Sequence, residues 1–244
     1  MANEISLTTI LYAALGGMVP TFIWLWFWLT EADDNHKEPI FLVILTFLGG
    51  AVGLLILLPL KPMILHMGLE PQTITIMYAF LEEFAKFSIV SLIAFKSGAI
   101  TRPADYAIFL VTGALGFSAL ENTLYLIKPI AANADIGSIL ITGNMRFLGA
   151  TVLHSVSSAL IGVLMGMGYS ALRSLRSLYA MFGMVLATGL HTVFNYFIMQ
   201  DTRQSTIIAI SGIWIVAVIV ILIFDRLQAL DANIKESYQP SPSQ

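Results

Sequence analysis

Apolar residues run in long, nearly uninterrupted stretches along almost the whole chain. Each stretch comes close to the roughly 20 residues that an α-helix needs to cross the hydrocarbon core of a bilayer. The pattern predicts seven spanning helices, at residues 7–29, 40–60, 74–95, 106–127, 147–170, 178–199 and 206–224. The connections are short and leave no room for a separate soluble domain. Residues 128–145 are mixed in character and are expected to form a loop that holds a re-entrant or interfacial piece.

The composition agrees with a membrane protein. Hydrophobic residues make up 57% of the 244 positions and charged residues 11%, whereas a soluble domain carries about 25% charged residues. The alternating segments of about ten residues that mark a spanning β-barrel are absent. The expected fold is therefore all-α, a polytopic transmembrane helical bundle. It is predicted as a single domain over residues 1–231, followed by a disordered cytoplasmic tail over residues 232–244.

Several function classes are excluded by simple counts. The chain has no cysteine, so disulfides and thiolate chemistry are ruled out. A net charge of −3 provides no basic face for nucleic acid. The first four residues, Met-Ala-Asn-Glu, lack the positive charge of a signal peptide, so the first apolar stretch is expected to stay in the membrane. The H-E-x-x-H signature of zincins and the Walker and dinucleotide-binding motifs do not occur.

The orientation follows from Lys and Arg in the loops, because cytoplasmic loops carry an excess of these residues. With the N-terminus outside, the cytoplasmic segments hold Lys37, Lys96, Arg102, Arg173, Arg176, Arg226 and Lys235. The opposite side then holds Lys61, Lys128, Arg146 and Arg203. This bias predicts a cell-membrane protein with an outside N-terminus and a cytoplasmic C-terminus.

The most informative local feature is a group of ionisable residues inside the third predicted helix. Glu82, Glu83 and Lys86 fall within five positions of an otherwise apolar stretch. Each ionised side chain at that depth costs at least about 2.5–3.5 kcal/mol and marks a functional site by default. A single Glu–Lys pair reads equally well as a neutralised structural contact. The second glutamate favours general-base chemistry, because two neighbouring carboxylates separate each other's proton affinities.

Polar residues in three other predicted helices lie at a matching depth. His154, His191 and Glu121 fall, like Glu82, roughly 9–12 Å below one membrane face at 1.5 Å per helical residue. His191 and Asn195 are four positions apart and share a helix face. A single membrane histidine is commonly an interhelical hydrogen-bonding group. Four polar positions that agree in depth predict one common site.

Other polar and small residues keep more than one interpretation. Glu121 fits a metal ligand, a residue that orients a histidine, or a partner of Lys86. Arg146 fits a contact with a lipid headgroup or with a substrate. Close helix packing is the expected role of the serines and glycines in the second and fifth helices, namely Gly49, Gly50, Gly53, Ser155, Ser157, Ser158, Gly162 and Gly166. No serine is therefore nominated as a nucleophile.

Together these residues resemble the PrsW family of intramembrane proteases, relatives of the CAAX-protease and bacteriocin-processing superfamily. The resemblance rests on four blocks in the family's order. They are Glu82-Glu83-x-x-Lys86, Phe117-x-x-x-Glu121-Asn122-x-x-Tyr125, His154, and His191-x-x-x-Asn195. CAAX-type relatives carry an arginine where this chain has Lys86, and usually a histidine where it has Glu121, so the PrsW branch is favoured.

The resemblance implies an endopeptidase that cuts a single-pass membrane protein near the extracytoplasmic face, as in the first cleavage of an anti-sigma factor. The expected catalytic residues are Glu82, Glu83, His154, His191 and Asn195, with Lys86, Glu121, Asn122 and Tyr125 in support. One of the two glutamates would activate water, His154 would hold that water, and His191 with Asn195 would donate to the oxyanion.

A zinc-dependent form of the same site stays open. It would use Glu83, His154 and His191 as ligands, because two histidines and a carboxylate with one open position form a legitimate zinc set. The lack of a helix with paired histidines slightly favours the metal-free form. Two other classes also stay open, a proton- or cation-coupled carrier and a non-catalytic membrane binding or immunity protein.

Overall fold

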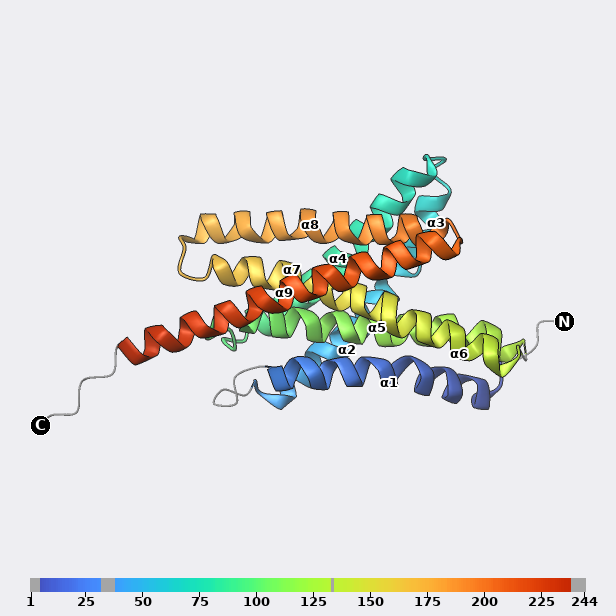
Figure 1. The fold of residues 1–244 in the computed structure, drawn as a ribbon, viewed down its shortest axis with the longest axis horizontal. Coiled ribbons are helices and arrows are strands. Elements are labelled where there is room, and N and C mark those ends of the chain that lie inside the picture. The colour runs from blue at the N-terminus through green and yellow to red at the C-terminus, as the bar shows by residue number, and fades with distance from the viewer. Residues whose placement is uncertain (1–4, 32–37, 133, 238–244) are drawn as a thin grey trace, which may run out of the picture.

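The computed structural model describes residues 5–31, 38–132 and 134–237, and this part of the chain is helical without any strand. Its longer helices are α1 (Leu7–Glu31), α2 (Ile40–Leu57), α4 (Pro71–Val90), α5 (Asp105–Ala131), α7 (Val152–Met167), α8 (Arg173–Met199) and α9 (Arg203–Ser237). Shorter segments are α3 (Leu60–Leu65), the π-helical η1 (Ser91–Phe95), α6 (Ile136–Met145) and the π-helical η2 (Arg146–Thr151). Successive long helices run in opposite directions, so that α1 begins and α9 ends at opposite ends of the bundle (Figure 1). The predicted all-α transmembrane bundle is confirmed.

Six helical segments of the described residues are long and apolar enough to cross a membrane. The remaining predicted span, the third at residues 74–95, corresponds to α4 and η1, which form one continuous helix of 20 and 5 residues. Its three ionisable residues, Glu82, Glu83 and Lys86, set it apart from those six segments. It packs against α2, α5, α7 and α8, so protein surrounds the polar side chains. Helix α9 continues to Ser237, and residues 238–244 lie outside the described part of the chain. The boundary between a membrane domain and a disordered tail at residue 231 therefore stays a prediction.

The predicted loop at residues 128–145 is wrong in extent. Helix α5 continues to Ala131, and α6 begins at Ile136, where Asp135 accepts a hydrogen bond from the Ser138 amide at 3.0 Å and caps the helix. Through η2, α6 runs directly into α7, so one apolar helical segment extends over Ile136–Met167. The cap and the turn at Ala132 therefore confine the connection to a few residues, too few to be recognised from composition.

Helix α5 lies at the centre of the bundle and packs against α1, α2, α4 and α7. Glycines allow these close approaches. A Cβ on Gly50 would lie 1.8 Å from the Gly113 carbonyl oxygen, and one on Gly116 would lie 1.7 Å from the Phe47 carbonyl oxygen. On α7, a Cβ on Gly162 would meet Ala107 at 2.3 Å. The expectation that glycines of the second and fifth predicted helices serve packing is confirmed at Gly50 and Gly162.

The start of α5 is fixed by a buried charge cluster. Asp105 accepts hydrogen bonds from the backbone amides of Thr101 and Arg102 at 2.7 and 2.8 Å. The Arg102 guanidinium contacts Asp105 at 3.1 Å and Glu38 at 3.4 Å. This cluster ties the α2 and α5 ends together, and holds α5 in register with α2.

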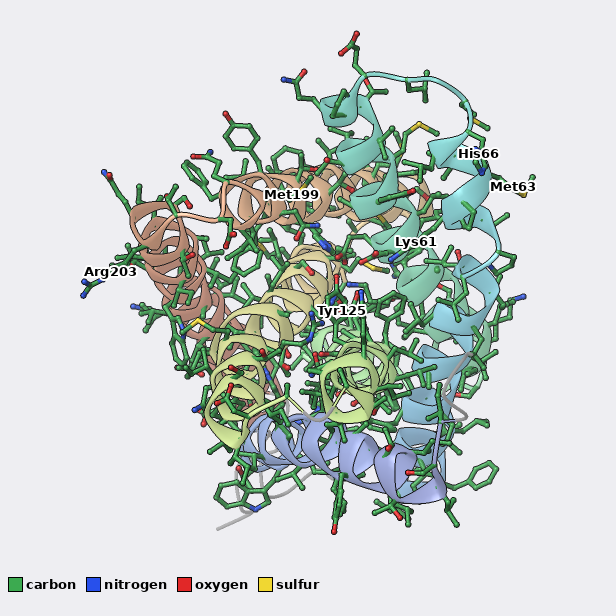
Figure 2. The ribbon with its side chains drawn as sticks, turned by 90° about the vertical axis from the view of Figure 1, so that its right-hand side faces the viewer. Lys61, Met63, His66, Tyr125, Met199 and Arg203 are labelled. Atoms are coloured by element: carbon green, nitrogen blue, oxygen red, sulfur yellow. The ribbon has the colours of Figure 1, made fainter. Side chains whose placement is uncertain are left out.

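The opposite end of the bundle carries α3 and the first turns of α4, which project beyond the neighbouring helices (Figure 1). Tyr78 on α4 donates a hydrogen bond to the Lys61 carbonyl oxygen at 2.7 Å, which fastens α3 to α4. The turn between them contains Gly68 at φ +67°, a conformation that favours glycine. Viewed from this end, Lys61 and Tyr125 lie near the middle of the bundle, with Met199 beside them (Figure 2).

Candidate active site

Glu83 is a fully buried carboxylate that connects three helices. Its Oε1 atom accepts from Lys86 Nζ at 2.6 Å on α4, from Ser157 Oγ at 3.0 Å on α7, and from His191 Nδ1 at 2.7 Å on α8. Its Oε2 atom is buried and has no hydrogen-bond partner among the described side chains and backbone. Glu83 therefore orients Lys86, Ser157 and His191 through Oε1 alone, and Oε2 takes no part in these contacts.

Glu82 faces a cavity, whereas Glu83 does not. The cavity has a volume of about 550 Å³, and its polar lining includes Lys61, Glu82, His154, His191 and Asn195. Glu82 Oε1 lies 2.6 Å from Lys61 Nζ, and Glu82 Oε2 lies 3.6 Å from His191 Nε2. Of the two adjacent glutamates, Glu82 is thus the one that a substrate or water in the cavity can reach.

A second chain of contacts starts at His154. Its Nε2 atom lies 3.0 Å from Glu121 Oε2, and the same oxygen accepts from the Arg146 guanidinium at 2.5 Å. Arg146 also donates to Asn122 Oδ1 at 2.5 Å and stacks over the Tyr125 ring at 3.9 Å from its centre. Of the alternatives for Glu121, the structure favours the residue that orients a histidine. Arg146, for which the sequence left a lipid headgroup or a substrate open, pairs with Glu121 and lines the same cavity.

The two histidines differ in what their ring nitrogens meet. Lys86 Nζ, which can only donate, lies 3.1 Å from His154 Nδ1, so Nε2 carries the proton that bonds Glu121. His191 donates from Nδ1 to Glu83, so its Nε2 faces Glu82 Oε2. Two electron-rich atoms 3.6 Å apart need a proton or a cation between them. Nε2 is therefore the His191 atom at which a proton or a cation in the cavity would be held.

The ionic groups of the site balance one another. Lys61 pairs with Glu82, Lys86 with Glu83, and Arg146 with Glu121, each at 2.5 or 2.6 Å. With neutral histidines the cluster carries no net charge, which lowers the cost of holding three carboxylates at membrane depth.

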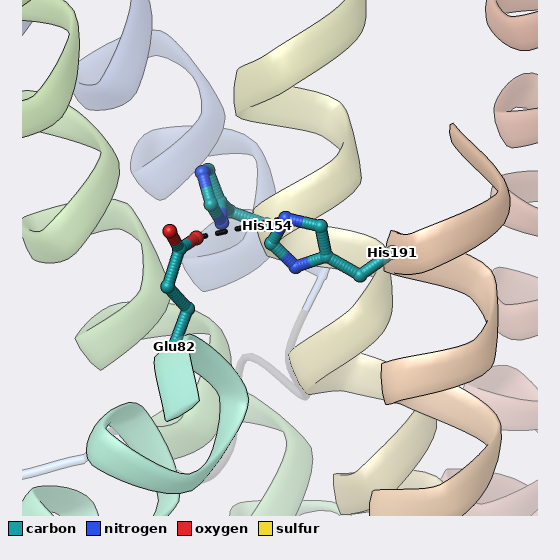
Figure 3. A group of neighbouring side chains, drawn as sticks. All are labelled: Glu82, His154 and His191. Atoms are coloured by element: carbon teal, nitrogen blue, oxygen red, sulfur yellow. Dashed lines mark ion pairs between the residues drawn. The ribbon is translucent and has the colours of Figure 1, made fainter. Parts of the chain in front are cut away.

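One group of side chains in the described part of the chain has the composition of a metal site. Glu82, His154 and His191 offer ligand atoms that all lie within 4.8 Å of one another. The three side chains come from α4, α7 and α8 and point toward one another (Figure 3). Because both ring nitrogens of His154 have partners, a metal would replace Lys86 or Glu121 as the neighbour of this histidine.

The structure brings together the residues that the sequence singled out, with some changes in role. Asn195 lines the cavity, Asn122 is buried and donates to Thr151 at 2.9 Å, and Tyr125 lies at the cavity mouth. The sequence-based zinc set named Glu83, whereas the geometry groups Glu82 with the histidines. Whether any of these residues takes part in catalysis stays a prediction.

Two functional contacts were missed by sequence reasoning. Lys61 was counted only as a loop charge, although it contacts Glu82. Ser157 was counted only as a packing residue, although it donates to Glu83. The spacing of Ser157, three positions after His154 on the same helix face, carried a signal that points to the site.

A comparison with protein families decides where the chain belongs. The model of the "PrsW family intramembrane metalloprotease" matches residues 38–224, which include every site residue named above. The chain belongs to the PrsW family. The resemblance inferred from the four sequence blocks is therefore confirmed.

Curated relatives include proteins named Protease PrsW from three bacteria. The one from Shouchella clausii is 28% identical over 137 residues, covering 55% of this chain and 58% of the relative. The one from Halalkalibacterium halodurans is 31% identical over the same coverage. The one from Geobacillus kaustophilus is 25% identical over 174 residues, covering 70% and 73%. The chain thus spans less than two thirds of the first two relatives, and no solved structure matches it significantly.

The residues of this PrsW-family site fit the metal that the family description implies. Two imidazoles and one carboxylate are an established donor set for zinc. Metal-binding histidines usually donate their second nitrogen to a carboxylate, and His191 does this through Nδ1 to Glu83. This fit weighs against the slight sequence-based preference for a metal-free enzyme.

Proposed function

We propose that this PrsW-family chain is a membrane-embedded endopeptidase that hydrolyses a peptide bond in a single-pass membrane protein. The observation that carries the proposal is the arrangement of Glu82 and His191 at one wall of a 550 Å³ cavity, with Glu83 behind His191. A base and a hydrogen-bond donor at one wall of a cavity that admits both water and a peptide are what amide hydrolysis needs.

In the proposed reaction Glu82 takes a proton from a water molecule in the cavity. The water oxygen bonds to the substrate carbonyl carbon, and the C–N bond then breaks as Glu82 returns the proton to the leaving amine. Asn195 donates a hydrogen bond to the oxyanion from its amide. His191 faces the same oxyanion with Nε2, which donates when that nitrogen is protonated.

The remaining residues hold this geometry. Glu83 keeps the His191 ring oriented through Nδ1, and Lys86 keeps Glu83 ionised at 2.6 Å. Glu121 and Arg146 hold His154 in a fixed position beside His191. These contacts lock the ring positions, and locked donors need no reorganisation during the reaction.

In the zinc-dependent form of the proposal, Glu82, His154 and His191 hold the ion. When bound, zinc supplies a Lewis acid that polarises a carbonyl oxygen and acidifies water. Glu82 would then be a ligand, and Glu121, the other carboxylate that lines the cavity, would be the group that accepts the proton. The family description supports this form over the metal-free one.

The orientation of the protein in the membrane and the identity of its substrate are proposed from the sequence and from the family. The excess of Lys and Arg on one side supports an outside N-terminus, which places the cavity toward the extracytoplasmic face. The family resemblance supports an anti-sigma-factor-like substrate whose cleavage starts a signalling cascade.

The proposal is tested by terminal-peptide mass spectrometry of host membranes. Wild type is compared at equal expression with Glu82→Gln and His191→Ala, and with the matched control Glu70→Gln at the exposed start of α4. We expect new termini in single-pass membrane proteins in the wild type and the control, and their loss in the two site variants.

Termini that persist in Glu82→Gln or His191→Ala would contradict the proposed site. A membrane proteome that is the same in all four strains, together with a growth phenotype, would favour the carrier or binding alternatives. A purified chain that cuts the identified protein in vesicles completes the test.

A further inference from the structure

A second cavity lies beside the first, on the other side of the α4–α8 contact. We call it the entrance groove. It has a volume of about 540 Å³ and its lining is almost entirely apolar. The groove is lined by Pro71, Gln72, Thr75, Ile76, Thr192, Val193, Tyr196, Phe197, Met199 and Gln200. The reaction proposed above involves none of the apolar side chains that line the entrance groove.

The entrance groove and the catalytic cavity share one wall. Pro71, Thr75 and Met199 line both spaces. Across this wall Thr75 Oγ1 lies 3.8 Å from Met199 Sδ. The contact is weak, because thioether sulfur is a poor acceptor and the single hydroxyl proton has a nearer acceptor in the Pro71 carbonyl oxygen at 3.0 Å. Met199 is also 67% exposed and has a flexible side chain. The partition between groove and cavity is therefore easily displaced.

Helix α8 presents the two spaces with adjacent faces. His191 and Asn195 are four positions apart and line the catalytic cavity. Thr192 and Tyr196 are also four positions apart and line the groove. One step along a helix rotates the side chain by 100°, so these two faces are neighbours. Thr192 donates its hydroxyl to the Thr188 carbonyl, so this polar group is already satisfied.

The groove is open on the outside of the bundle. Ile76, Val193 and Tyr196 are about half exposed, and in a membrane such side chains face lipid tails. Two amide side chains, Gln72 and Gln200, lie at the end of the groove where α4 begins and α8 ends. An apolar stretch that ends in polar groups has the character of the end of a transmembrane segment.

From this juxtaposition we propose that the entrance groove binds the apolar transmembrane segment of the substrate and passes the adjoining residues between Thr75 and Met199 into the catalytic cavity. The proposal rests on the proposed protease function and specifies the route to the same site. The wall that the groove shares with the cavity favours a peptide over a lipid tail, because only a peptide gains from reaching Glu82 and His191.

The test compares two substrates and two tryptophan variants. Val193→Trp fills the groove, and Val185→Trp places the same side chain on the same helix, at an exposed position outside the groove. One substrate is the single-pass protein identified by its new termini, reconstituted with the enzyme in phosphatidylethanolamine–phosphatidylglycerol vesicles. The other is a short water-soluble peptide that covers the cleaved bond and needs no route through the membrane.

We expect Val193→Trp to lower kcat/KM at least tenfold for the membrane protein and less than twofold for the soluble peptide. Val185→Trp should change neither value by more than twofold. The proposal is overturned if Val193→Trp leaves both substrates unaffected or slows both equally. If the wild type cuts neither substrate, the protease function itself fails, and the groove proposal fails with it.

A binding measurement separates the substrate from lipid. Because the chain has no cysteine, a single Val193→Cys or Val185→Cys can carry a benzophenone photo-crosslinker in the Glu82→Gln background. We expect an adduct with the same single-pass protein from position 193 and none from position 185. Adducts with lipid alone from position 193 would overturn the proposal.

Discussion

Lys61 on α3 places its ammonium nitrogen 2.6 Å from Glu82 Oε1, in the lining of the 550 Å³ cavity of the candidate site. The lysine side chain is 30% exposed, so it can leave the carboxylate and enter water. Lys61 and a divalent cation would compete for the same carboxylate. In the zinc-dependent form of the proposal, Lys61 would therefore be the ion-pair partner of Glu82 when no zinc is bound.

Removing this competitor should tighten zinc binding. We expect Lys61→Met to lower the Kd for zinc several-fold, corresponding to about 1 kcal/mol for a partly exposed ion pair. Competition with a chelator of known affinity measures the Kd. Lys61→Arg should resemble the wild type, and the remote, exposed Lys96→Met serves as control. Weaker zinc binding in Lys61→Met would show that the lysine supports the site instead.

The roles of the two adjacent glutamates predict different metal contents. Glu82→Gln, His154→Ala and His191→Ala should each remove most of the zinc from the purified chain, because each would lose a ligand. Glu83→Gln should weaken the affinity by about 10–100-fold, since Glu83 acts on the metal through His191. Elemental analysis and chelator competition measure both effects. If Glu83→Gln lost all of its zinc while Glu82→Gln retained it, the ligands would instead be Glu83, His154 and His191, as the sequence predicted.

The buried Glu83–Lys86 pair should behave as a unit in stability measurements. Lys86→Met leaves an uncompensated carboxylate at a fully buried position, at a cost of about 3–5 kcal/mol. The double variant Glu83→Gln with Lys86→Met should cost less than the sum of the single changes. Unfolding in detergent micelles gives the four free energies of the cycle. Simple additivity would contradict a direct interaction.

Helix packing at α5 gives a prediction that is independent of catalysis. Gly116→Ala should destabilise the protein by about 1–3 kcal/mol, because its Cβ would meet the Phe47 backbone and force α2 away. Gly212→Ala, where nothing lies within 4 Å, should be neutral or slightly stabilising. The melting temperatures in detergent compare the two. Equal melting temperatures would show that α2 and α5 are less tightly packed than described.

Much of the bundle could be predicted because a polar residue in an apolar helix is a strong signal. Glu82, Glu83, Lys86, His154 and His191 stood out against their surroundings, and matching depth alone placed them together. Lys61 gave no such signal, since a lysine at the polar end of an apolar stretch is ordinary. Only the fold shows that α3 directs it back toward Glu82.

The connection between α5 and α7 was misread for a different reason. Segment 128–145 mixes Pro129, Asn133 and Asp135 with apolar residues, and this mixture is typical of a loop. Pro129 is accommodated in the last turn of α5, and Asp135 already caps the next helix, so that α6 has room for ten residues. A π-helical segment such as η2 has no sequence pattern of its own, so its position could not be derived.

The π-helical segment η2 also sets the rotational phase of the two helices that it joins. Arg146 lies at its start and meets Glu121, while His154 follows its end and meets the same carboxylate. If all the residues of this wide turn were wound as a regular α-helix instead, one part would be rotated against the other by about 100°. Such a chain would keep every side chain of the candidate site in its sequence, yet Arg146 and His154 would no longer meet at one carboxylate.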